Sequence, residues 1–166
     1  LVSKGLGALD ESDLATAKIA LVEAQKLNPD STTVNEALLS IKQRQRSIKM
    51  IAMQDMLTEY LQAENYLAAL DVVKDLEAMD HSSSLRAKIS EIAGYIEIEN
   101  RIDSYANQLT SLSSVSLRKA IQEVIAEIEA ADVTRFGDRI ESKYQQLKSR
   151  YTALAVKVEL ELISDG

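Results

Sequence analysis

The chain has 166 residues, and its composition is that of a folded protein, with 46% hydrophobic and 27% charged residues. The net charge of −7 argues against nucleic acid as the main partner, because binding to phosphates requires clustered Lys and Arg. The sequence has no cysteine, which excludes disulfides, thiolate metal sites and a cysteine nucleophile.

Helices are predicted along almost the whole chain, since it contains only five Gly and one Pro. In chain order they are expected over 1–9, 12–27, 33–64, 66–79, 84–112 and 117–131, with a last long helix from about residue 135. The apolar stripe predicted along the helix over 33–64 consists of Val34, Leu38, Ile41, Ile48, Ala52 and Leu57. No apolar run reaches the roughly 18 residues that a membrane span requires.

Small and apolar residues recur every 52 residues in these helices. The three sets are Ala17, Leu21 and Ala24; Ala69, Val73 and Leu76; and Ile121, Ile125 and Ile128. A fixed period of this kind indicates helix pairs that bury their faces against one another in a stack. We therefore predict an all-α α-solenoid forming a single domain over 1–163, with repeats over about 1–31, 32–83 and 84–133 and a closing helix over 134–163.

The first repeat carries a characteristic spacing of Gly5, Ala17, Leu21, Ala24 and Pro29. This pattern resembles that of the tetratricopeptide repeats, and it covers about thirty residues. The second repeat keeps only some of these positions and the third keeps only apolar character. The period of 52 also exceeds the family's, which is about 34. The resemblance implies a degenerate tetratricopeptide-like array with elongated helices, a fold that binds other proteins rather than transforming them.

The last helix carries heptad spacing. Its members are Ile140, Tyr144, Leu147, Tyr151, Leu154 and Val158. Such a stripe can drive coiled-coil pairing, but we favour packing on the preceding short helix of the same chain. The tail then alternates apolar and charged residues and ends in Asp-Gly, which predicts a strand and the start of a truncated β domain over 156–166. Without partner strands, this tail is expected to remain helical or to fray.

Residues for catalysis are scarce. His81 is the only histidine and falls in a predicted turn, so a zinc site lacks ligands. No phosphate-binding glycine loop, nucleophile elbow or EF-hand loop occurs. The carboxylates Glu97, Glu99 and Asp103 are expected to form a solvated helix face with i,i+4 pairs. We expect no enzyme activity, no cofactor and no metal site.

Candidate residues for binding a partner are aromatic or acidic. Tyr60, Tyr66, Tyr95 and Tyr105 can line a groove as anchors, although residues of this kind are more often part of the core. The second repeat is acidic, with Asp71 and Asp75 at its centre.

A basic stretch with Lys42, Arg44, Arg46 and Lys49 has no acidic residue between Glu36 and Asp55. Solvated surface explains such charges in most proteins. The functional alternative is electrostatic complementarity, either with a basic partner or between copies of this chain arranged head to tail.

Two functions follow from these observations. The first is a non-enzymatic scaffold that binds a protein partner through a helical repeat face. The second is a structural spacer or coiled-coil oligomerisation rod, which would make homo-oligomers. The chain begins with Leu1, so we expect it to be a piece of a longer protein, in contact with a membrane only through segments outside this chain. By analogy with repeat arrays of bacterial envelope proteins, a periplasmic location is expected.

Overall fold

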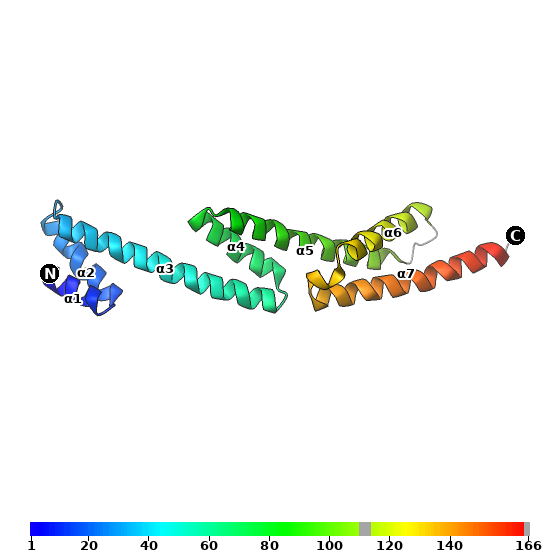
Figure 1. Cartoon of the computed structure of the whole chain (residues 1–166), viewed down its shortest axis with the longest axis horizontal. Coiled ribbons are helices and arrows are strands. Elements are labelled where there is room, and N and C mark those ends of the chain that lie inside the picture. Colours follow the sequence, from blue (N-terminus) through cyan, green and yellow to red (C-terminus); the bar gives the residue numbers. More distant parts are fainter. Residues whose placement is uncertain (110–113, 165–166) are drawn as a thin grey trace. The chain divides into compact units, whose positions relative to one another are not determined.

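The protein is all-α in a computed structural model that describes the backbone of residues 1–109 and 114–164, and the side chains as far as residue 156. The described residues form seven α-helices and no strand, and 89% of the chain is helical (Figure 1). The chain divides into two compact units, Leu1–Met56 and Leu57–Gly166. None of the described helices combines the length and the apolar character needed to cross a membrane.

The first unit contains α1 (Val2–Asp10), α2 (Leu14–Leu27) and most of α3 (Thr32–Gln62). Asp13 caps α2 by accepting a hydrogen bond from the amide of Thr16 at 3.0 Å. Gly5 lets α1 approach α2 closely, because a Cβ at this position would lie 2.6 Å from Cγ of Leu21. Pro29 lies exposed in the turn before α3. The core of the unit consists of Ala8, Leu9, Ala17, Leu21, Ala24, Val34, Ala37 and Ile41.

The middle of α3 is exposed over residues 42–49. Arg44 donates a hydrogen bond to the carbonyl oxygen of Leu9, at the C-terminal end of α1, so α3 continues past the end of the α1–α2 hairpin. The prediction that Ile48 and Ala52 belong to the core stripe is therefore wrong: both are exposed, Ile48 by 59%. Helical spacing places these residues on the correct face, but Ile48 lies at the end of the α1–α2 hairpin, where, among the described residues of that hairpin, only Ser12 and Leu14 come near it, and Ala52 lies one turn further along α3.

The second unit contains the end of α3, α4 (Tyr66–Asp80), α5 (Ser83–Gln108), α6 (Val115–Ala130), the short 3-10 turn η2 (Val133–Phe136) and α7 (Asp138–Ser164). The helices α4 and α5 lie side by side and are joined by His81, whose φ of 51° ends α4 in the left-handed conformation (Figure 1). The fully buried members of the shared core include Ala69, Val73, Ile92, Ile102, Ile121, Ile128, Ile140, Tyr144 and Leu147.

The heptad stripe of α7 is buried inside the chain. Ile140, Tyr144 and Leu147 are no more than 1% exposed and share a core with residues of α5 and α6. Packing within one chain is therefore confirmed for these positions, but the main neighbour of α7 is α5 rather than the preceding short helix α6. The tail forms no strand: α7 continues to Ser164, as expected for this segment in the absence of partner strands. Except at its ends, a helix forms its backbone hydrogen bonds within one segment, whereas a strand needs a partner. That a β domain begins here stays a prediction.

Candidate functional site

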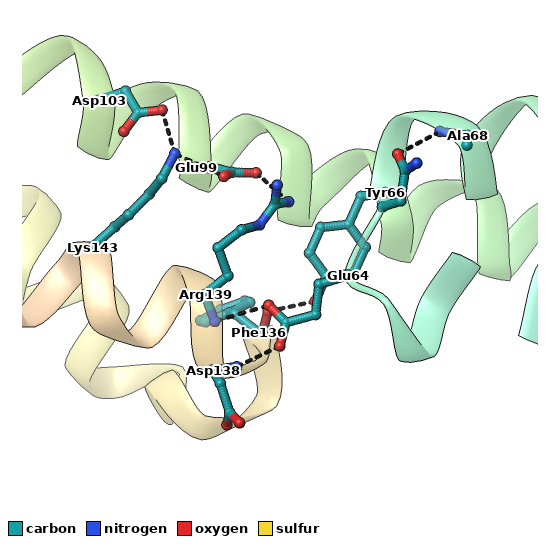
Figure 2. A network of polar contacts seen from close by, with 10 residues as sticks. Glu64, Tyr66, Ala68, Glu99, Asp103, Phe136, Asp138, Arg139 and Lys143 are labelled. Atoms are coloured by element: carbon teal, nitrogen blue, oxygen red, sulfur yellow. Dashed lines mark hydrogen bonds and ion pairs between the residues drawn. The ribbon is translucent and has the colours of Figure 1, made fainter. Parts of the chain in front are cut away.

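The turn between α3 and α4 is tied to the start of α7 by one carboxylate. Glu64 has a φ of 52°, and its two side-chain oxygens accept hydrogen bonds from the amides of Asp138 and Arg139, each at 2.8 Å (Figure 2). These amides belong to the first turn of α7, which has no partner for them within the helix. A negative charge is also favourable at a helix N-terminus. The contact therefore fixes the beginning of α4 relative to α7.

Tyr66, the first residue of α4, is 5% exposed and donates a hydrogen bond from its hydroxyl to the carbonyl oxygen of Phe136 at 2.7 Å. Its ring meets that of Tyr95 edge to face at 5.2 Å, and Tyr95 meets Phe136 in the same manner at 5.6 Å. Burial, and then the hydrogen bond to Glu91, raises the pKa of Tyr95 to about 12. Two of the four candidate tyrosines thus belong to one internal aromatic cluster.

Gly137 separates η2 from α7 and has a φ of 88° with a ψ of 164°, a combination that is almost restricted to glycine. A Cβ at this position would lie 2.7 Å from both Cδ of Glu64 and the hydroxyl oxygen of Tyr66. The close approach of the α3–α4 turn to α7 therefore requires glycine here.

Charged side chains of α5 and α7 join the two helices beside this turn (Figure 2). Glu99 pairs with Arg139 and with Lys143, each at 2.8 Å, and Lys143 also contacts Asp103 at 2.7 Å. Hydrogen bonds to Asp103 and then Glu99 raise the pKa of Lys143. The expectation that Glu99 and Asp103 form solvated pairs along their own helix is wrong, because their cations come from α7. The spacing along one helix could not reveal a partner 40 residues away.

The outer face of α4 is acidic and lies opposite the buried residues Ala69, Val73 and Leu76. Leu67 is 67% exposed, and Asp71 and Asp75 follow it at intervals of one helical turn, both exposed. Neither aspartate makes an ion pair or a hydrogen bond with another described side chain, and Lys74 is the only cation of α4. We call Leu67, Asp71 and Asp75 the acidic α4 face.

The remaining candidate residues lie at the edge of the core. Tyr60, Tyr105 and Ile125 are half-buried and pack against the core of the second unit. His81 is exposed, and its imidazole lies 3.9 Å from the carboxylate of Glu77. The four tyrosines therefore do not gather on one open surface, whereas Asp71 and Asp75 do share a face. Leu67 was not predicted from the sequence as a member of that face. Its position one residue after Tyr66 places it off the buried stripe, and this was the available signal of its exposure.

The described residues contain no group of three His, Cys, Asp or Glu side chains that could hold a metal ion. The acidic α4 face presents two negative charges along the helix beside one exposed apolar side chain.

Comparison of the chain with known protein families, with curated proteins and with solved structures found no match.

Proposed function

We propose that the chain is a non-enzymatic scaffold that binds a basic protein segment through the acidic α4 face. The observation that carries this proposal is the arrangement of Leu67, Asp71 and Asp75, three exposed residues on a helix whose opposite face is fully buried. An exposed leucine beside unpaired carboxylates matches a partner that presents a cation next to an apolar surface.

The contacts that anchor the start of α4 favour such a role, because they hold the acidic α4 face in a defined position before a partner binds. Tyr66 is fixed by Phe136, and Glu64 is fixed by two amides of α7. A preformed surface binds with a smaller loss of conformational entropy. Burying Leu67 would contribute about 1.5–3 kcal/mol, and each exposed ion pair about 0.2–1 kcal/mol. Binding through this face alone is therefore weak and sensitive to salt.

A degenerate tetratricopeptide-like solenoid with a period of 52 residues is the architecture we propose for this scaffold. Two observations support it. The recurring residues Ala17, Ala69 and Ile121 are all fully buried, and Gly5 packs closely against α2 as the family's pattern implies. The period is longer than the family's because α3 and α5 have 31 and 26 residues.

A structural spacer is the second candidate function. It is favoured by α3, whose 31 residues span about 46 Å and whose middle, residues 42–49, is exposed. A helix of this kind can separate two units without binding anything. A spacer should tolerate charge reversal on α4, whereas a scaffold should not, so one experiment distinguishes the two functions.

The experiment is affinity capture with the tagged chain, from soluble and membrane lysates, at about 0.05 M and 0.5 M salt. The scaffold predicts a protein that is captured at low salt and lost when Asp71 and Asp75 are both changed to Lys. The matched control changes Asp55 and Glu59, an exposed pair with the same spacing on α3, to Lys. Capture that survives reversal on α4, or that is lost equally in the control, contradicts the proposed face.

A further inference from the structure

A basic hollow lies between α2 and α3 of the first unit. It has a volume of about 310 Å³ and is lined by Lys18, Leu38, Ile41, Lys42 and Gln45. Leu38 and Ile41 supply an apolar floor, and the exposed Lys18 and Lys42 stand on opposite sides, one on each helix. No acidic side chain lines the hollow.

A third lysine extends this surface along α3. Lys49 is exposed and follows Lys42 by seven residues, which places both on the same side of the helix about 10 Å apart. Lys18, Lys42 and Lys49 make no ion pair with any described side chain. We call the hollow together with Lys49 the basic α2–α3 surface.

We propose that the basic α2–α3 surface binds the acidic α4 face of a second copy of this chain. This inference rests on the proposed function of the acidic α4 face and names its partner. Leu67 of one copy enters the hollow and covers the half-buried Leu38 of the other, while Asp71 and Asp75 pair with the lysines at its rim.

Three features make the two surfaces complementary. On each surface apolar side chains are followed along one helix by two charges, and the charges are opposite in sign: Leu67 precedes Asp71 and Asp75, and Leu38 and Ile41 precede Lys42 and Lys49. The spacing also fits, because Asp71 and Asp75 lie about 6 Å apart along α4, within the reach of flexible lysine side chains placed about 10 Å apart. Finally, the first unit carries seven basic and seven acidic residues, whereas the second carries 12 basic and 19 acidic ones. Contact between unlike units thus relieves the repulsion that contact between two second units would produce.

The contact joins two different surfaces, so it is heterologous. Each added copy leaves one acidic and one basic surface free, and association continues head to tail unless a ring closes. The average mass should therefore rise steadily with concentration, with no plateau at a dimer. Because the charges are exposed, the association should weaken strongly as the Debye length falls from about 10 Å at 0.1 M salt to about 3 Å at 1 M.

Sedimentation of the whole chain tests this inference with variants in which the charges of one or both surfaces are reversed. One variant changes Lys42 and Lys49 to Glu, the second changes Asp71 and Asp75 to Lys, and the third combines all four changes. At low salt we expect the unmodified chain to increase in average mass with concentration, and each double variant to remain monomeric. The fourfold variant, and an equimolar mixture of the two double variants, should associate again.

Matched controls separate this contact from a general effect of charge. Changing Lys4 and Lys26 to Glu alters the net charge as much as the first variant, but at exposed positions outside the hollow, and it should leave the association unchanged. Circular dichroism of each variant verifies that its helices are intact.

Three results would contradict the proposed contact between copies. A chain that remains monomeric at every concentration overturns it, as does association that persists in both double variants or that fails to return in the fourfold variant. The proposed function has a separate outcome. If the Asp71 and Asp75 variant loses capture of another protein, while the Lys42 and Lys49 variant keeps that capture and the chain never self-associates, the scaffold stands and the second copy is excluded as its partner.

Discussion

Changing Gly137 to Ala tests how the second unit is held together. The added methyl group would lie 2.7 Å from Cδ of Glu64 and 2.7 Å from the hydroxyl oxygen of Tyr66. The Glu64 carboxylate joins the α3–α4 turn to α7, and the Tyr66 hydroxyl joins the start of α4 to Phe136 of η2, so neither group can move without losing a hydrogen bond.

The expected cost combines two effects. A non-glycine residue at a φ of 88° and a ψ of 164° costs about 1–3 kcal/mol, and overpacking a filled site costs about 1–3 kcal/mol more. We expect a loss of about 3 kcal/mol in the free energy of unfolding. With a urea dependence of about 2 kcal/mol per molar, this loss lowers the unfolding midpoint by about 1.5 M.

The assay is urea unfolding followed by tyrosine fluorescence. All six tyrosines lie between residues 57 and 166, so this signal reports on the second unit alone. Circular dichroism follows both units together, and a difference between the two curves shows how independently they unfold.

Gly94 provides the control for the same chemical change. A Cβ at this position, in the middle of α5, meets no atom within 4 Å. Changing Gly94 to Ala should therefore raise stability by about 0.5–1 kcal/mol, through the better helix propensity of alanine. If the Gly137 variant unfolds at the same urea concentration as the unmodified chain, or if both variants are destabilised equally, the close contact described around Gly137 is wrong.

Three further predictions concern other parts of the structure. Changing Ala24 to Arg should destabilise the first unit by a few kcal/mol, since this residue is 4% exposed; an unchanged melting curve by circular dichroism would refute its place in a helix–helix contact. Changing Glu64 to Ala should cost about 1 kcal/mol and speed hydrogen exchange at the amides of Asp138 and Arg139, with unaltered exchange as the contrary result. Raising the pH from about 10 to about 12 should destabilise the second unit, because the folded chain keeps the Tyr95 proton that the unfolded chain releases near pH 10. Changing Tyr95 to Phe should reduce this alkaline loss, and an identical pH dependence in the two proteins would contradict the raised pKa.

Local patterns predicted the helices well. The short helix expected over 66–79 is α4, Tyr66–Asp80. It was predictable because its apolar residues recur at helical spacing. The first short helix, expected over 12–27 and observed as α2, Leu14–Leu27, was predictable for the same reason. These signals depend on residues only three or four positions apart.

Contacts between distant residues were not predictable in the same way. The prediction for Ile48 failed because spacing gives the face of a helix but not the length of its neighbour. The bond from Glu64 to the amide of Asp138 joins residues 74 positions apart, and no local pattern of charges indicates it. For the candidate site, Asp71 and Asp75 could be selected from the clustering of acidic residues. Leu67 became a candidate only when its exposure was known.

The most direct test of the acidic α4 face as a binding surface is photo-crosslinking in the cells that make the protein. A photoreactive amino acid replaces Leu67 in one experiment and Leu27, which is 78% exposed on α2, in the other. We predict a specific protein adduct from position 67 and none from position 27. The adduct should disappear when Asp71 and Asp75 are changed to Lys. No adduct from position 67, or the same adducts from both positions, would contradict the proposal that this face of α4 binds a protein.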